Sequence, residues 1–294
     1  MKRLLLAVFT ATLAFAQQDF SQVQIKTTKV SNNFYTLEGS GGMIGVLVGT
    51  DGVFMVDTQY AQLTDKLVAA IKAITPLPVK YVVNTHVHPD HTGGNENFAK
   101  LGATLISRPE LRNRLAHPNP GANGAPGTPA PAAALPAITI DGITTYRMNG
   151  EEIQLIPIHS AHTDGDTLVR FVKNDVIMTG DFYRSIQYPN VDRANGGSVN
   201  GMLDGLGWVI GQAGPNTKII PGHGTTVDRS AVVAHRDMML SLRDKVAAMI
   251  AQGKTQAEIT AAKLTADTDS KVKEVGTTGD RFIGQLYADL QATK

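Results

Sequence analysis

The sequence contains no cysteine among its 294 residues. Disulfide bonds, thiolate ligands for a metal ion, a cysteine nucleophile and an acylated lipoprotein cysteine are therefore all excluded. The fold must be stabilised without covalent cross-links, and any bound metal ion must be held by nitrogen and oxygen ligands.

Net charge and clustered basic residues are also lacking. The formal net charge is +1 at pH 7 and the pI is about 7.9. Lysine and arginine are spread along the chain without a long run, whereas nucleic-acid-binding domains usually cluster their basic residues and have a higher pI. The sequence therefore predicts no nucleic-acid partner and favours a small-molecule substrate.

Long apolar runs are confined to the N-terminus. Met1-Lys2-Arg3 provides a positive start, residues 4–15 form an apolar run broken only by threonines, and Ala14-Phe15-Ala16 fits the small-x-small cleavage pattern. This run is well short of the roughly 20 apolar residues that a membrane-spanning helix needs. We expect residues 1–16 to be a cleaved signal peptide, the protein to be periplasmic or secreted, and a stable membrane anchor to be absent.

The composition as a whole is that of a globular protein, with 42% hydrophobic and 18% charged residues. Strand-like and helix-like patterns alternate, which predicts an α/β layered fold. We expect residues 17–294 to form a single domain with a C-terminal helical tail from about residue 228. Runs rich in β-branched and aromatic residues predict strands at 34–38, 43–48, 52–56, 79–83, 103–106, 138–140, 144–148, 153–158, 167–172, 176–178 and 218–220. Helical spacing predicts helices at about 63–71, 94–100, 199–210 and 228–251. The Pro-, Gly- and Ala-rich stretch 118–136 predicts a surface loop.

The segment Thr85-His86-Val87-His88-Pro89-Asp90-His91 is the strongest motif in the chain. His86 and His88 lie two residues apart at a strand end, so their side chains fall on the same face and can converge on one ion. Pro89 then turns the chain, and Asp90 and His91 leave that turn toward a second point. The alternative is a set of polar loop residues whose hydrogen bonds are satisfied locally.

Three downstream residues argue for metal binding. His162 follows the predicted strand 153–158, Asp181 follows 176–178, and His223 follows 218–220. Loops just past strand ends project functional groups from a rigid sheet. His159 is an alternative to His162, whereas His117 and His235 lack any partner pattern and are expected on the surface or on a helix face.

In its order H-x-H-x-D-H, then His, Asp and His, the chain resembles the metallo-β-lactamase superfamily from about residue 30 to 251. The resemblance implies a four-layer αβ/βα sandwich with the site along one edge between its halves. It implies that the first metal ion is bound by His86, His88 and His162. It implies that the second is bound by Asp90, His91 and His223, with Asp181 bridging both ions.

One position departs from the best-known lactamases of this family. They carry Cys or Ser where this chain has Asp181, whereas a carboxylate is typical of the family's glyoxalase-II-like hydrolases and lactonases. Asp181 therefore supports the superfamily and weakens the specific assignment as a β-lactamase. Asp57 matches a family position that braces the ligand loop by hydrogen bonding.

The proposed ligands suit two zinc ions and are also compatible with iron or manganese. Two divalent ions, two carboxylates and a bridging hydroxide leave a net charge of about +1, which favours an anionic substrate. A metal-bound hydroxide needs no serine or cysteine nucleophile. By resemblance, Asp90 is the catalytic residue that orients the nucleophile or relays a proton.

The sequence thus predicts an exported binuclear zinc hydrolase that attacks an amide or ester-type carbonyl, with a β-lactam-like substrate favoured. The alternatives are a lactonase or glyoxalase-II-like thioesterase, a mononuclear iron persulfide dioxygenase, and a non-catalytic zinc-binding protein. Tyr183 and Arg184 are expected to be structural, with substrate contact as the alternative. Our hypothesis for the loops 39–43 and 118–136 is that they flank the substrate cleft. Nothing in the sequence indicates an oligomeric state.

Overall fold

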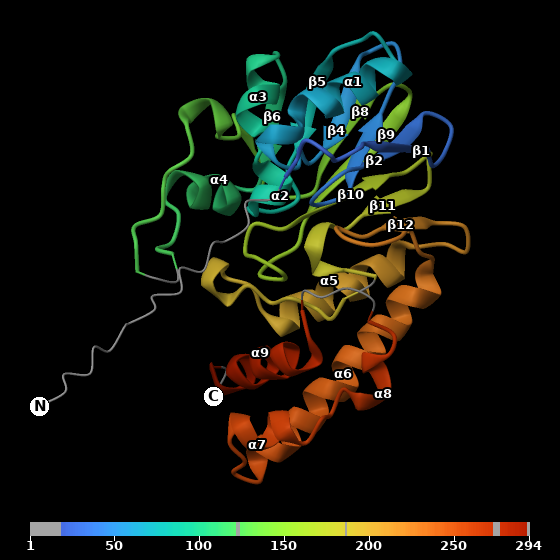
Figure 1. The fold of residues 1–294 in the computed structure, drawn as a ribbon. Coiled ribbons are helices and arrows are strands. Elements are labelled where there is room, and N and C mark those ends of the chain that lie inside the picture. The colour runs from blue at the N-terminus through green and yellow to red at the C-terminus, as the bar shows by residue number, and fades with distance from the viewer. Residues whose placement is uncertain (1–18, 122–123, 186, 273–276, 293–294) are drawn as a thin grey trace, which may run out of the picture.

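A computed structural model describes residues 19–121, 124–185, 187–272 and 277–292. The predicted signal peptide, residues 1–16, lies outside the described residues. Within them, two β-sheets pack face to face, and helices cover the outer face of each sheet (Figure 1).

The first sheet follows the chain order from its N-terminal edge. Strands β1 to β4 pair antiparallel, and β4 to β7 pair parallel. Their bounds are Lys26–Lys29 (β1), Phe34–Glu38 (β2), Ile44–Leu47 (β3), Val53–Val56 (β4), Val79–Val83 (β5), Thr104–Ser107 (β6) and Ile138–Thr139 (β7). The parallel half requires crossovers, and these carry the helices of this face.

The second sheet has the order β12-β11-β10-β9-β8. All its pairs are antiparallel except β11 with β12, which run parallel. The bounds are Thr144–Met148 (β8), Glu151–Pro157 (β9), Thr167–Phe171 (β10), Val176–Met178 (β11) and Lys218–Ile220 (β12). Because β11 and β12 are parallel, the residues that follow them, Asp181 and His223, emerge at the same edge of the sheet.

The core between the sheets follows from the two-residue period of strands. In β4, Phe54 and Val56 point into the space between the sheets, while Val53 and Met55 point to the outer face. In β11, Met178 faces inward in the same way. Such strands are apolar on both faces, as strands covered on both sides should be.

Helices form the outer two layers. The first sheet is covered by α1 (Thr64–Ile74) and α3 (Asn95–Lys100), and the second by α5 (Val199–Gln212), α6 (Arg229–Ala251) and α9 (Gly279–Ala292). The predicted four-layer αβ/βα sandwich is therefore confirmed. Shorter helices are α2 (Pro89–Thr92), α4 (Pro109–Ala116), α7 (Gln256–Ala261) and α8 (Ala266–Asp269), with 3-10 turns η1 (Ala61–Leu63), η2 (Ala132–Ala134), η3 (Gly180–Phe182) and η4 (Arg193–Asn195).

The predicted strands and helices match the observed ones within a few residues at their ends. Strand β1 and helices α2 and α4 were not predicted, and α7, α8 and α9 were expected only as part of a helical tail from about residue 228. Strand β1 is exposed along its whole length and so lacks the alternation that marks a half-buried strand.

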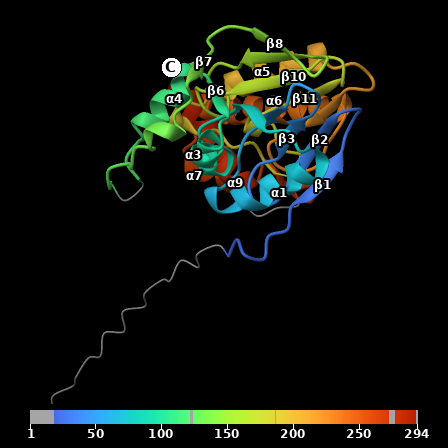
Figure 2. The ribbon, with the colours of Figure 1, turned by 90° about the horizontal axis from the view of Figure 1, so that it is seen from above.

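In the described part of 118–136 the only regular element is η2, in agreement with the predicted loop. In both views the green segment after α4 projects from the body of the molecule (Figure 2). Among the described helices, none is both long and apolar enough to cross a membrane.

Candidate metal centre

The histidine motif lies directly after β5, at the edge where the two sheets meet. Strand β5 ends at Val83, His88 keeps an extended backbone with ψ 148°, and Pro89 opens the short helix α2. Proline is favoured at the first helical position because its fixed φ suits the helix and its missing N–H is not needed there. The turn separates His86 and His88 from Asp90 and His91, as predicted.

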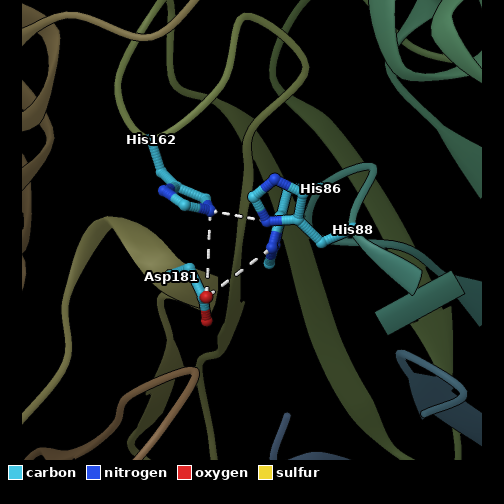
Figure 3. Close-up of side chains that lie close together, drawn as sticks. All are labelled: His86, His88, His162 and Asp181. Carbon is cyan, nitrogen blue, oxygen red and sulfur yellow. Dashed lines mark hydrogen bonds and ion pairs between the residues drawn. The ribbon is translucent and has the colours of Figure 1, made fainter. Parts of the chain in front are cut away.

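The first cluster consists of His86, His88, His162 and Asp181 (Figure 3). One ligand atom from each side chain lies within 4.8 Å of the others. His88 Nδ1 is 2.9 Å from His162 Nε2, and Asp181 Oδ2 is 3.8 Å from His162 Nε2. Three histidine nitrogens and one carboxylate oxygen at this spacing form a donor set that suits zinc.

The second cluster consists of Asp90, His91 and His223. Oδ2 of Asp90 is 3.1 Å from Nε2 of His223 and 3.6 Å from Nε2 of His91. His91 is fully buried, whereas the side chains of Asp90 and His223 each retain 18% exposure. This cluster is therefore open to solvent on the side of Asp90 and His223.

Asp181 connects the two clusters. Its Oδ1 is 3.3 Å from Nε2 of His91, and its Oδ2 is 3.4 Å from Nε2 of His223 while also facing the first cluster. One buried carboxylate thus contacts histidines of both groups. The structure therefore brings together all seven residues that the sequence predicted as ligands.

Two buried polar atoms indicate that the centre is built for cations. Nε2 of His86 and Oδ1 of Asp181 have no hydrogen-bond partner among the described residues. Leaving a buried polar atom unsatisfied costs about 1 to 3 kcal/mol. A metal ion next to each atom would remove this cost, so the residues present fit a two-metal site.

Hydrogen bonds from outside the clusters orient the rings of His162 and His88. Nδ1 of His162 is 2.6 Å from the carbonyl oxygen of Asn190, which can only accept, so Nδ1 carries the proton and Nε2 keeps its lone pair. Nε2 of His88 is 2.7 Å from the Asp192 carboxylate, which leaves Nδ1 as the free ligand atom. Such outer contacts are typical of metal-binding histidines.

Asp57 braces the motif as the sequence predicted. Its carboxylate accepts hydrogen bonds from backbone N and from Oγ1 of Thr85, both at 2.7 Å, and contacts Nδ1 of His91, also at 2.7 Å. The residue is buried and has a φ of 62°, an uncommon backbone conformation that Asp tolerates better than most residues. Asp57 therefore fixes the strand end and the ring of His91 together.

The protonation states suit metal ligands. Burial lowers the pKa of His86 well below its usual value and that of His162 to about 3, so both rings are neutral. Burial alone would raise the pKa of Asp90, but the hydrogen bond from His223 and the nearby charge of His91 lower it to about 2. Burial likewise opposes ionisation of Asp181, yet Arg184, His223 and other nearby cations hold its pKa well below the usual range. Metal ions bind neutral imidazoles and ionised carboxylates.

His91 and His223 behave differently in the absence of a metal ion, because nearby carboxylates raise the pKa of both rings against the effect of burial. Burial would lower the pKa of His91, but the carboxylates of Asp181 and Asp57 raise it well above the usual value. A proton on Nε2 of His91, which faces the carboxylates of Asp181 and Asp90, would thus occupy the place of a cation. Binding of a metal ion at the second cluster should therefore displace this proton.

Arg184 contacts the centre through Asp181. Its Nε donates a 3.1 Å hydrogen bond to Oδ2 of Asp181, and its Nη2 also donates to this oxygen. Tyr183 is buried and packs edge-on against the ring of His235. Tyr183 is thus structural, as expected, whereas Arg184 adds a positive charge beside the bridging carboxylate.

The other histidines lie outside the clusters. His159 is exposed and its Nδ1 is 3.2 Å from Nη2 of Arg108, so the structure supports His162 in its place. His117 is exposed, as expected. His235 lies on α6 as a half-buried residue, and burial lowers its pKa to about 4.

Sequence reasoning missed the residues that hold the His162 loop. Asp166 accepts hydrogen bonds from backbone N of His162 and of Thr163. Arg114 forms two hydrogen bonds, 2.8 and 2.6 Å long, with the carboxylate of Asp164. The sequence did contain a sign of this support, the two aspartates in the turn His162-Thr163-Asp164-Gly165-Asp166. Short acidic side chains commonly accept hydrogen bonds from nearby backbone N–H groups.

The segment 188–192 was missed as well, because it shows no motif. It provides Asn190 and Asp192, which orient His162 and His88. Helices after residue 251 hold this segment: the hydroxyl of Tyr188 donates a 2.8 Å hydrogen bond to Asp269, and Gln285 bonds to Asn190 at 3.0 Å. Supports of this kind depend on tertiary packing and leave no local pattern in the sequence.

Comparison with known proteins gives consistent matches. A family model described as the metallo-beta-lactamase superfamily matches residues 38–251. The inverting sec-alkylsulfatase Pisa1 from Pseudomonas sp. aligns with a TM-score of 0.71 and 18% identity over 90% of this chain, which spans 50% of that protein's length. A metallo-beta-lactamase from Pontibacter korlensis aligns with a TM-score of 0.61 and 19% identity, covering 74% of this chain and 99% of its own. The DIM-1 metallo-beta-lactamase aligns with a TM-score of 0.60 and 18% identity, covering 74% of this chain and 98% of its own. At these identities, the likeness to the solved structures shows the fold.

Proposed function

The chain belongs to the metallo-beta-lactamase superfamily, and we propose that it is an exported binuclear zinc hydrolase that opens an amide or ester-type carbonyl of a small anionic molecule. The observation that carries the proposal is the position of Asp181, one buried carboxylate in contact with histidines of two adjacent clusters. A site for a single ion would need only one of these clusters. This arrangement favours a two-metal hydrolase over a mononuclear iron dioxygenase.

Two zinc ions, when bound, would supply a hydroxide nucleophile near neutral pH and polarise the substrate carbonyl. The residues of the chain hold and orient the reacting groups. Asp90 is suited to hold or relay a proton because its carboxylate is ionised, partly exposed and 3.1 Å from His223. The charge of Arg184 beside Asp181 adds to the attraction of an anionic substrate.

A β-lactam-like cyclic amide remains the favoured substrate class. The solved lactamases that resemble this chain share its fold across nearly their whole length. The carboxylate of Asp181 keeps lactones and thioesters as the competing carbonyl substrates. The alkylsulfatase is similar over 90% of this chain but is about twice as long, so a sulfate ester belongs in the same test.

The test is a panel of substrates with the zinc-loaded protein. It includes a chromogenic β-lactam, a lactone, a thioester, a phosphodiester and a secondary alkyl sulfate, together with oxygen uptake on a persulfide after iron loading. We expect turnover of the lactam or of another carbonyl substrate, and about two zinc ions per chain. Turnover confined to the persulfide with one iron ion would identify the dioxygenase, and two bound zinc ions without any turnover would support the non-catalytic alternative.

Two variants connect the activity to the residues. His88→Ala and Asp181→Ala should each lower metal content and hydrolysis together, because each removes a ligand atom from the centre. His117→Ala is the matched control, since this exposed histidine lies outside both clusters. Wild-type rates in either ligand variant would refute the mechanism.

Export is tested separately, by mass spectrometry of the mature N-terminus in a periplasmic fraction, where cleavage after Ala16 is expected.

A further inference from the structure

Two cavities border the metal centre at its opposite clusters, and we propose that they bind different parts of the substrate. The cavity at His88 would bind an uncharged, apolar group, and the hollow at His223 would bind the polar part. The proposal deepens the proposed function and rests on it, because it assumes that the scissile bond lies over the metal centre.

The apolar cavity has a volume of about 560 Å³ and includes His88, a residue of the first cluster, in its wall. The rest of the lining comes from α2 and the residues around it up to Glu96, the end of α4, residues 118–120 and 128–131 with Ala134, and the segment 192–195. Its apolar surface is provided mainly by Val87, Pro89, Leu115, Pro118, Ala130 and Pro131. This supports the hypothesis that the loop after α4 flanks the cleft.

The charged residues in this lining are already paired. Arg114 forms two hydrogen bonds with Asp164, Glu96 is 2.7 Å from Nζ of Lys100, and Asp192 contacts His88. A charged substrate group would therefore lose its hydration in the cavity without gaining a free partner of opposite charge. An uncharged apolar group has no such cost and gains from burial.

The hollow at the other end is of a different kind. It has a volume of about 420 Å³ and is lined by His223, the glycine-rich segment 38–41 and the turn 222–225, with Met43 as its one large apolar residue. A Cβ atom at Gly41 would lie only 2.8 Å from Cβ of Asp90, so the backbone approaches the second cluster more closely than a larger residue would allow. Backbone groups, the hydroxyls of Ser40 and Thr225, and the carboxylate of Glu38, which is 3.0 Å from Nζ of Lys26, make this surface polar, which suits a polar group.

The two cavities together define an orientation. A substrate with its reacting carbonyl at the metal centre would place its apolar substituent toward Leu115 and Ala130, and its polar part toward Gly41 and Thr225. The substrate class is thus an amphipathic ester, thioester or lactam with an uncharged substituent on one side of the scissile bond.

Binding of an inert probe tests the apolar cavity without turnover. The probe is 2-phenylethanol, which has no scissile carbonyl, titrated into the zinc-loaded full chain by calorimetry, with glycerol as the polar comparison. We expect binding of 2-phenylethanol that is at least ten-fold weaker in Ala130→Trp, because the indole would fill the cavity. Ala133→Trp is the matched control, since Ala133 is exposed, lies two residues after Pro131 and does not line the cavity.

A second variant, Leu115→Ala, tests the same cavity in case Ala130→Trp does not fold. Leu115→Ala removes apolar contact without adding bulk and should weaken 2-phenylethanol binding several-fold. Absence of binding in the wild type, or binding unchanged in both Ala130→Trp and Leu115→Ala, would overturn the proposal. If the probe binds as expected but no panel substrate is hydrolysed, the proposed function fails while the apolar site stands.

Kinetics with paired substrates test the orientation. A hexanoyl thioester and the otherwise identical adipoyl thioester differ only by a terminal carboxylate on the acyl chain. We expect kcat/KM to be at least ten-fold higher for the hexanoyl compound in the wild type and in Ala133→Trp, and this preference to be lost in Ala130→Trp. An equal or higher kcat/KM for the adipoyl compound would refute an apolar acyl site.

Discussion

The side-chain amide of Gln285 donates a 3.0 Å hydrogen bond to Oδ1 of Asn190, and its oxygen accepts a 3.1 Å hydrogen bond from backbone N of Val191. Gln285 lies in α9, beyond residue 251, where the match to the family model ends. The backbone carbonyl of Asn190 in turn accepts the hydrogen bond from Nδ1 of His162 that orients this ring. The C-terminal helix therefore supports the first cluster through a chain of two hydrogen bonds.

Replacement of Gln285 should weaken metal binding at the first cluster. Gln285→Met keeps the size of the side chain but removes both hydrogen bonds, and we expect zinc affinity to fall by about ten-fold, the low end of the effect of outer contacts on metal sites. Gln285→Glu keeps an acceptor for Val191 but cannot donate to Asn190, so its loss should be smaller. Competition with a chromogenic chelator measures the affinity.

The matched control is Gln291→Met, on an exposed position of the same helix. It should leave zinc affinity unchanged. Equal affinities in wild type and Gln285→Met would show that α9 contributes to the fold without positioning the ligands.

Substitution of Asp57 should disturb the second cluster. Asp57→Asn presents an amide NH₂ that cannot accept all the hydrogen bonds now made by Thr85 and His91. If the amide faces Nδ1 of His91, that nitrogen must accept, and the proton moves to the nitrogen that faces the metal centre. We expect zinc affinity to fall by about 10- to 100-fold, as measured by chelator competition and metal analysis.

Asp65→Asn is the comparison, because Asp65 is an exposed acid at the start of α1. It removes the same charge from the chain at a distance from the centre. A similar loss of affinity in both variants would point to net charge instead of the hydrogen bonds of Asp57.

The ligand motif could be predicted from the sequence because its residues follow strand ends, and these strands can be read as short apolar runs rich in β-branched residues. Val176 to Met178 and Lys218 to Ile220 were expected as strands, and their parallel pairing brings Asp181 and His223 to one edge. Asp192 and Gln285 could not be found in this way. Asp192 is 104 residues from His88 in the sequence, and only the packing of the segment 188–192 against α9 brings it to that ring.

Two helices that were not predicted individually, α4 and α7, share a physical explanation: each buries a single residue. In α4, Leu111 is the only buried residue, so there is no apolar stripe to detect. In α7 the buried residue is Ile259 alone, although Thr255 and Glu258 form a capping box that marks its start. The capping signal was present in the sequence and would have predicted the beginning of this helix.

Protonation of His235 should destabilise the fold in acid. Burial lowers its pKa to about 4, below the ordinary value of 6.5. The folded chain therefore binds this proton less readily than the unfolded chain, and stability is fully present above pH 6.5 and is lost as the pH falls toward 4. The loss attributable to this ring should be about 1 to 3 kcal/mol.

The measurement is urea unfolding of chelator-treated protein at pH 7.5 and pH 4.5. His235→Phe, which keeps a ring against Tyr183 but cannot be protonated, should lose less stability between these values than the wild type. His117→Gln should behave as the wild type because His117 is exposed. Equal pH dependence in all three proteins would assign the acid sensitivity to other groups.

Glycine at position 222 is required by the bridging carboxylate. A Cβ atom at Gly222 would overlap Oδ1 of Asp181, and the backbone of this residue is held on both sides by hydrogen bonds to Gly180 and Met43. The turn cannot move away without breaking those bonds, so Asp181 must move instead. Gly222→Ala should therefore lower zinc affinity by at least about ten-fold and reduce the thermal stability of the zinc-loaded protein.

Gly211→Ala, in α5, is the matched control, because a Cβ atom there meets nothing within 4 Å. We expect normal zinc binding in this variant, with a gain in stability of up to about 1 kcal/mol. A zinc content of Gly222→Ala equal to that of Gly211→Ala would mean that the contact between Asp181 and the turn is not what positions the bridging carboxylate.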